Sequence, residues 1–165
     1  MNNVILIGMP GSGKTTIGTL LSEELGYGYV DSDSVIVARE GKRLNEIIAE
    51  QGMEAFLDVE AKVNASLCAS RCVIATGGSV IYREYAMEAL KKIGTIVYLK
   101  LSYEEIDKRL GDLKARGVAV KDGFTLLDLY NERVPLYEKY ADIVVELDGK
   151  SIYQSVQEVY KAVKK

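Results

Sequence analysis

The stretch GMPGSGKTT, residues 8–16, stands between the apolar run VILI, residues 4–7, and the helix-like run IGTLL, residues 17–21. It matches the P-loop pattern Gly-x4-Gly-Lys-Thr, whose glycines let successive backbone N–H groups point into an anion-sized hollow at a helix N-terminus. The lysine of such a loop reaches the β- and γ-phosphates of a nucleotide, and the following hydroxyl binds Mg²⁺. The stretch therefore predicts binding of a nucleoside triphosphate, with a purely structural glycine turn as the alternative.

The rest of the chain alternates short apolar segments with helical patterns. Strands are expected at residues 4–7, 29–31, 73–76, 95–99 and 143–146. Three apolar stripes at helical spacing are Ile17, Leu20, Leu21 and Leu25; Phe56, Val59, Val63 and Leu67; and Ile152, Val156, Val159 and Val163. This alternation predicts an α/β fold with a mostly parallel sheet and helices on both faces. Ligands of such folds bind at the carboxyl edge of the sheet.

Composition narrows the class of protein. The chain has 165 residues, of which 48% are hydrophobic and 27% are charged, so we expect one domain over residues 1–165. A net charge of −3 argues against a nucleic-acid partner. No apolar run is long enough to span a membrane and the start of the chain has no basic leader, so we expect a cytoplasmic protein. With no histidine and only Cys68 and Cys72, neither a closed zinc site nor a Ser-His hydrolase is expected.

Two aspartates follow the second expected strand. If the segment is extended, alternate side chains point the same way, so Asp31 and Asp33 face the edge of the sheet while Ser32 faces away. Carboxylates there hold hydrated Mg²⁺ or take the proton of an attacking hydroxyl. The alternative is that Asp33 caps the next helix, a position that Asx residues favour.

Further candidates follow the third and fourth expected strands. The pair Gly77-Gly78 permits close approach of a ligand to the backbone, although a plain turn is the alternative. Three arginines supply the cations that phosphoryl transfer needs, unless they are ordinary surface charges; they are Arg109, Arg116 and Arg133. The glycine-rich basic segment 111–123 is typical of a mobile lid over phosphates, with an ordinary surface connection as the alternative.

Other motifs stand in a fixed order along the chain. They are Phe56-Leu-Asp-Val-Glu60, Gly77-Gly78, Arg133-Val-Pro-Leu-Tyr137 and Tyr140-Ala-Asp142. With the P-loop and the Asp-x-Asp pair, this set resembles the shikimate kinases over essentially the whole chain. The resemblance implies a three-layer, nucleoside monophosphate kinase-like P-loop fold with a five-stranded parallel sheet and a mobile lid at about 111–123. It also implies a substrate-binding helical region at about 33–62, and ATP-dependent phosphorylation of a shikimate hydroxyl in aromatic amino acid biosynthesis.

The resemblance also implies roles for individual residues. Those implied in catalysis are Lys14, Asp33 and Arg116. Those implied to hold ATP are Gly11, Ser12, Gly13, Lys14, Thr15, Thr16, Arg109 and Arg116, with Arg109 against the adenine. Mg²⁺ is assigned to Thr15 and Asp31, and the acceptor to Asp33, Gly78 and Arg133. The expected partners are ATP and a small hydroxylated metabolite, and the expected state is a monomer.

Three positions depart from the family pattern. Leu57 stands where the family usually has an arginine that helps hold the shikimate carboxylate, Ser79 replaces the third glycine of a Gly-Gly-Gly turn, and Gly117 replaces a lid proline. A lost arginine–carboxylate contact weakens a complex by about ten- to a hundred-fold. Shikimate is therefore the first expected acceptor, and another hydroxy acid, hydroxy amino acid or sugar acid is the alternative. A silent nucleotide-binding module and a nucleoside monophosphate kinase are the less favoured readings.

Overall fold

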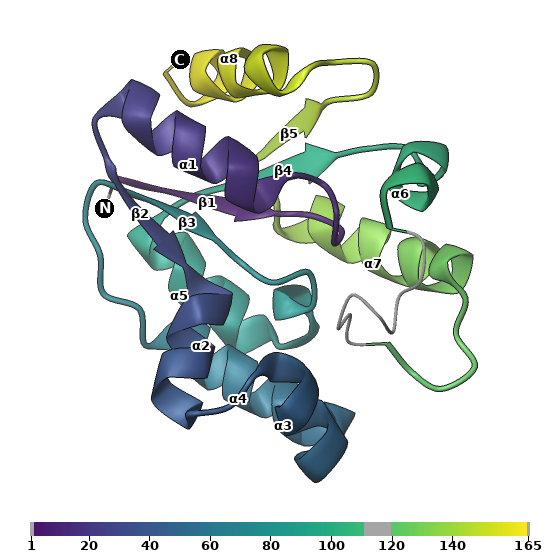
Figure 1. The fold of residues 1–165 in the computed structure, drawn as a ribbon. Helices are drawn as coiled ribbons and strands as arrows, with labels where there is room; N and C mark the ends of the chain where they lie inside the picture. Colours follow the sequence, from purple (N-terminus) through teal and green to yellow (C-terminus); the bar gives the residue numbers. More distant parts are fainter. Residues whose placement is uncertain (1, 111–119, 165) are drawn as a thin grey trace.

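The computed structural model describes residues 2–110 and 120–164, and its centre is a five-stranded parallel sheet (Figure 1). The strands are β1 (Asn3–Ile7), β2 (Gly28–Asp31), β3 (Cys72–Ala75), β4 (Gly94–Lys100) and β5 (Ile143–Glu146). Their order across the sheet is β2-β3-β1-β4-β5, and every pair is parallel. All five expected strands and the α/β class are confirmed, with ends that differ from the expected ones by at most one residue.

Strand β1 lies at the middle of the sheet, where Val4 pairs with Val73 of β3 and with Thr95 of β4. All five of its residues are buried. A strand covered on both faces is apolar throughout rather than alternating, which explains the unbroken run that precedes the P-loop. The loop after β1 therefore leaves the carboxyl edge at the centre of the sheet.

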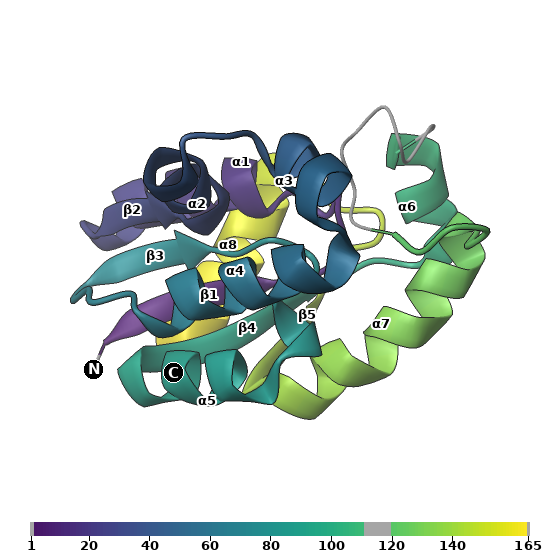
Figure 2. The same ribbon diagram turned by 90° about the horizontal axis from the view of Figure 1, so that it is seen from below.

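Helices cover both faces of the sheet (Figures 1 and 2). Helix α1 (Lys14–Leu25) and helix α8 (Ile152–Lys164) lie side by side on one face. The opposite face carries α5 (Glu84–Ile93) and α7 (Leu126–Tyr140), with α4 (Met53–Ala65) alongside α5. The remaining helical elements are α2 (Ser32–Glu40), α3 (Leu44–Gln51), the short 3₁₀ helix η1 (Val80–Tyr82) and α6 (Tyr103–Leu110).

A second, smaller core joins α2, α3 and α4 apart from the core around the sheet. Its buried members are Ile36, Ile47, Phe56, Leu57 and Val63. This cluster holds the three helices together beyond β2.

Two details of the expected helical stripes are wrong. Helix α4 ends at Ala65, so Leu67 lies beyond the helix and packs on the core of the sheet instead. Leu20 of α1 and Ile152 at the start of α8 are 38% and 42% exposed, so these two stripe residues lie at the edge of the contact between the two helices rather than in the core. Among the residues described, no helix is long and apolar enough to cross a membrane. Arg116, Gly117 and most of the expected lid fall at 111–119 and lie outside the described residues.

Candidate functional site

The P-loop joins β1 to α1 at the carboxyl edge of the sheet. Gly8 has φ +154°, and a Cβ on it would lie 2.9 Å from the Leu99 carbonyl oxygen. Gly13 caps α1 with φ +96°. Side chains at these two positions would strain the backbone or collide with β4, so the tight path of the loop requires glycine. The amides at the start of α1 are thereby available to an anion.

Lys14 is folded back over this loop. Its Nζ donates hydrogen bonds to the carbonyl oxygens of Gly8, at 2.6 Å, and Met9, at 2.9 Å. Burial lowers the pKa of Lys14 to about 8, and the nearby Asp33 carboxylate opposes that shift. The ammonium group is held in place, and its positive charge is only partly compensated by nearby carboxylates, as expected of a cation that binds phosphates.

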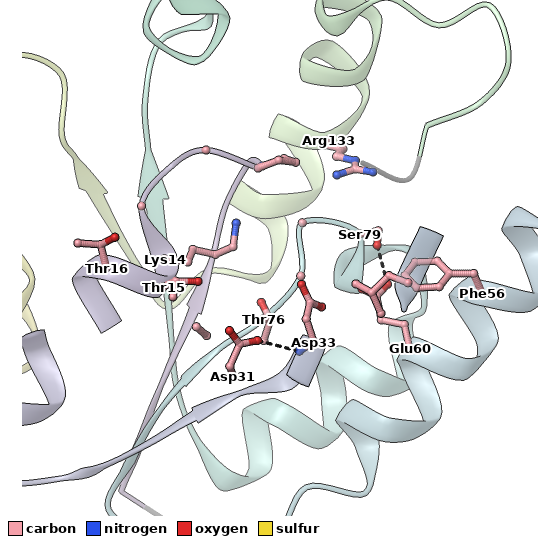
Figure 3. A pocket seen from close by; sticks show the side chains of 17 residues that line it. Lys14, Thr15, Thr16, Asp31, Asp33, Phe56, Glu60, Thr76, Ser79 and Arg133 are labelled. Carbon is pink, nitrogen blue, oxygen red and sulfur yellow. Dashed lines mark hydrogen bonds between the residues drawn. The ribbon is translucent and has the colours of Figure 1, made fainter. Parts of the chain in front are cut away.

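A cavity of about 410 Å³ opens beside the loop (Figure 3). It is enclosed by the P-loop, the first turn of α1, the ends of β2 and β3, and side chains from α3, α4 and α7. The expected site residues that border it are Gly11, Gly13, Lys14, Thr15, Thr16, Asp31, Asp33, Gly78 and Arg133. Segments far apart in the sequence therefore bring most of the expected residues to one place.

Two expected nucleotide residues lie beside the cavity rather than on its wall. Ser12 is buried within the loop, and its Oγ lies 3.5 Å from the Lys14 Nζ. Arg109 of α6 donates from Nη1 to the Gly11 carbonyl at 3.1 Å, and from Nε to Glu105 at 3.1 Å. Helix α6 is thus tied to the outer side of the P-loop by a side chain that the sequence assigned to ATP.

The sequence left open which aspartate faces the edge of the sheet and which one caps the next helix, and the structure separates these roles. Helix α2 begins at Ser32, so the segment is not extended, and Asp31 rather than Asp33 is the N-cap. The Oδ1 atom of Asp31 accepts from the backbone N–H groups of Asp33, at 3.0 Å, and Ser34, at 3.3 Å. Both carboxylates nevertheless border the cavity, while Ser32 is fully buried.

Asp33 has the properties of a base. Its Oδ1 is buried and has no hydrogen-bond partner within the described part of the chain. Burial, reinforced by the negative charge of Asp31, raises the pKa of Asp33 to about 6, while Lys14 opposes the shift. A carboxylate with a raised pKa is a stronger proton acceptor than an ordinary aspartate and is still ionised at neutral pH.

Arg133 is buried at the far end of the cavity, with 1% of its surface exposed. Its Nε donates to the Tyr82 hydroxyl at 3.1 Å, and its guanidinium lies over the Tyr82 ring. The Tyr137 hydroxyl donates to the Gly78 carbonyl at 2.7 Å. A Cβ on Gly78 would lie 2.8 Å from Arg133 Nη1, so Gly78 must lack a side chain for the arginine to fit. Tyr82 thus positions Arg133, and Tyr137 positions the Gly78 backbone; sequence reasoning missed both contacts.

Glu60 and the side chain of Ser79 form a second feature that the sequence did not assign. The Ser79 hydroxyl donates to Glu60 Oε1 at 2.7 Å, and Glu60 is 2% exposed (Figure 3). Burial raises the pKa of Glu60 to about 7; the Ser79 hydrogen bond lowers it and the charge of Asp33 raises it. The available signal was a glutamate within an apolar helical stripe, because a buried carboxyl there needs a partner.

Leu57 does not border the main cavity. It is 7% exposed and lines a smaller cavity of about 120 Å³ with Tyr82 and Phe124. Arg83 lines the same smaller cavity, but its guanidinium is paired with Glu54 at 2.6 Å and Asp58 at 3.0 Å. Because it is paired with these two carboxylates, Arg83 does not take the place of the arginine that the family usually has at position 57.

Comparison with known proteins decides the family. The sequence pattern of the shikimate kinase family matches residues 10–164. The chain belongs to the shikimate kinase family. It is 34% identical over 160 residues to the shikimate kinase of Persephonella marina, covering 96% of this chain and 97% of that protein. It is 40% identical over 153 residues to that of Pseudomonas fluorescens, covering 91% and 89%.

A solved structure agrees with this result. The shikimate kinase of Acinetobacter baumannii in complex with shikimate superimposes with a TM-score of 0.88 at 30% identity, over 99% of this chain and 93% of that one. As a member of the shikimate kinase family, the chain is a small-molecule kinase with a nucleotide substrate, and its P-loop fold is that of the family. The resemblance stated from the sequence motifs is confirmed.

Proposed function

We propose that the chain transfers the γ-phosphoryl group of MgATP to a hydroxyl group of shikimate. The observation that carries the proposal is that one cavity joins Lys14 of the P-loop to the buried Arg133, with Asp33 between them (Figure 3). Phosphoryl transfer requires cations at the phosphates, a base at the attacking hydroxyl and a fixed acceptor. A polyol with a carboxylate presents a hydroxyl to Asp33 and an anion to Arg133.

The nucleotide half of the site is assigned to the P-loop and to two arginines. The proposed ATP-binding residues are Gly11, Ser12, Gly13, Lys14, Thr15, Thr16, Arg109 and Arg116. Lys14 exchanges its bonds to loop carbonyls for phosphate oxygens, and the α1 amides add to the positive field. Arg109 is already anchored at Gly11, next to where the nucleotide enters. The assignment of Arg116 rests on the sequence.

Thr15 and Asp31 are proposed to hold Mg²⁺. Both border the cavity, the Thr15 residue is exposed, and the Asp31 cap uses only the Oδ1 oxygen. A hydroxyl and a carboxylate oxygen suit this hard cation, which prefers oxygen ligands and retains several waters. When bound, Mg²⁺ offsets the charge that develops between the β- and γ-phosphates.

The proposed chemical step needs no covalent enzyme intermediate. The acceptor hydroxyl gives its proton to Asp33 as its oxygen bonds to the γ-phosphorus. The bond from that phosphorus to the β,γ-bridging oxygen breaks, and ADP leaves with the electron pair. Lys14 stabilises the charge on the transferring group. Gly78, Arg133 and Asp33 hold the acceptor in line, and residues 1–165 act as one catalytic domain.

A second candidate acceptor class is favoured by Leu57. Position 57 carries no charge, and Arg83 is engaged by Glu54 and Asp58. Arg133 is therefore the one described arginine that borders the acceptor end of the cavity. A hydroxy acid, hydroxy amino acid or sugar acid that needs a single arginine is the alternative acceptor.

Coupled ADP release with MgATP tests the proposal, with shikimate compared against a panel of hydroxy acids, hydroxy amino acids and sugars. Shikimate turnover with a sub-millimolar KM supports it. Brisk turnover of another acceptor beside little activity on shikimate would establish the second candidate.

A further inference from the structure

Ser79 borders the main cavity beside Gly78 and contacts Glu60 there. It follows Gly78, is 5% exposed, and directs its hydroxyl to Oε1 of Glu60 on α4. Within residues 2–110 and 120–164, the Glu60 carboxyl forms no ion pair, since Leu57 one helical turn earlier is apolar. The Ser79 hydroxyl is therefore the direct partner of this buried carboxyl, while the charges of Arg133 and Lys14 act on it from a greater distance.

The second oxygen of Glu60 lies on the other side of the same carboxyl, toward Asp33. A Cβ placed on Gly77 would lie 2.7 Å from Glu60 Oε2 and 2.8 Å from Asp33 Oδ1. The two oxygens thus flank one point above the Gly77 backbone. Asp33 Oδ1 has no hydrogen-bond partner in the described part of the chain. The two carboxyls therefore lie side by side against the Gly77 backbone, and both residues border the main cavity.

Such a pair is suited to a ligand that donates hydrogen bonds. Two close carboxyls repel each other when both are ionised and are costly to bury without donors. Neighbouring hydroxyl groups on a ring supply one donor to each carboxyl, whereas an anionic group would be repelled. The pair therefore selects the polyol part of an acceptor, and Arg133 is left for its carboxylate.

We propose that Ser79 is a positioning residue: it fixes one oxygen of Glu60 and turns the other toward Asp33, so that the two carboxyls together bind neighbouring hydroxyl groups of the acceptor. The inference rests on the proposed function, because it deepens how the same site holds a hydroxylated acceptor. Ser79 and Glu60 act on binding, whereas Asp33 alone accepts the proton.

Steady-state kinetics with Ser79→Ala and Ser79→Thr test the inference. Loss of the hydroxyl in Ser79→Ala raises the KM for shikimate about five- to twenty-fold, with the KM for ATP within twofold of the wild type. Ser79→Thr keeps a hydroxyl and restores most of the affinity. Ser34→Ala is the matched control, since Ser34 is an exposed serine on α2, and it leaves both KM values unchanged.

An analogue of shikimate that lacks the hydroxyl next to the phosphorylated one separates positioning from a general structural effect. The wild type should bind this analogue more weakly than shikimate. In Ser79→Ala the difference should be much smaller, because the contact between Glu60 and that hydroxyl is already weakened. An equal loss in both proteins would overturn the inference, and so would a rise in the KM for ATP to match that for shikimate.

Titration of the Glu60 carboxyl by NMR in the ATP-free protein needs no acceptor. Removing a hydrogen bond to the ionised form raises a carboxyl pKa, so Ser79→Ala moves the Glu60 titration upward by about one pH unit. An unchanged titration overturns the inference. If the wild type does not turn over shikimate, the proposed acceptor fails, and this titration still decides whether Ser79 holds Glu60.

Discussion

Replacement of Asp33 by asparagine should stabilise the protein while it disables the site. The pKa of Asp33 is raised from 3.8 to about 6, first by burial and then by the charge of Asp31. Each pH unit corresponds to about 1.4 kcal/mol, so ionising Asp33 in the folded protein costs about 3 kcal/mol. This cost is absent below about pH 4, develops as the pH rises through 6 and is complete above it.

Asp33→Asn removes that pH-dependent cost. The amide carries its own penalty, because one of its atoms remains buried without a partner, but that penalty is the same at every pH. The gain in free energy of unfolding at pH 8 should exceed the gain at pH 4.5 by about 2 kcal/mol. The phosphoryl-transfer rate should fall at least about a hundred-fold, because the base is lost.

Urea unfolding followed by circular dichroism at the two pH values measures the stability difference. Asp107→Asn is the matched control for the loss of a carboxylate, since Asp107 is exposed on α6. Equal stability changes for Asp33→Asn at pH 4.5 and pH 8 would refute the reasoning that burial and the charge of Asp31 make ionised Asp33 destabilising.

Three further substitutions test the acceptor end of the cavity. Gly78→Ala places a methyl group 2.8 Å from Arg133 Nη1. The KM for the acceptor, measured by coupled ADP release, should rise at least tenfold. An unchanged KM would show that Arg133 does not hold the acceptor. Tyr137→Phe leaves the Gly78 carbonyl without its donor and should lower the free energy of unfolding, measured in urea, by about 1–2 kcal/mol. Tyr153→Phe is the control, because Tyr153 is 70% exposed, and it should have no effect. Equal losses in both variants would exclude the Tyr137–Gly78 hydrogen bond as the cause. Leu57→Arg should lower the KM for shikimate about tenfold if the second arginine is missing from this site, with Leu57→Met as the control for packing; an unchanged or higher KM would count against that idea.

The sheet and the P-loop were predictable because their signals are local. An apolar run covered on both faces and a loop that requires glycine leave marks within a few residues. The position of the cap was not predictable, because Asp31 and Asp33 are equally good capping residues and only the start of α2 separates them. The assumption of an extended segment failed for the same reason.

The supporting contacts of the site were not predictable from local patterns. Tyr82 and Arg133 meet from η1 and α7, and Ser79 reaches Glu60 across 19 positions of sequence. Nothing near Tyr82 in the sequence distinguishes it from an ordinary core residue, and the departure from the family pattern at Ser79 did not point to Glu60 as its partner. The direction of Arg83 was equally hidden, because the carboxylates that hold it lie on α4, 25 and 29 positions earlier.

The hydrogen bonds of Lys14 to Gly8 and Met9 have a consequence for turnover. Because the ammonium group has partners of its own within the loop, it is a positioned charge rather than an exposed one. If Lys14 binds the phosphates as proposed, a nucleotide competes with these two carbonyl oxygens for the ammonium group, which lowers its affinity. On the same proposal, the two carbonyls again accept from the lysine when the product leaves, which would favour the release of ADP.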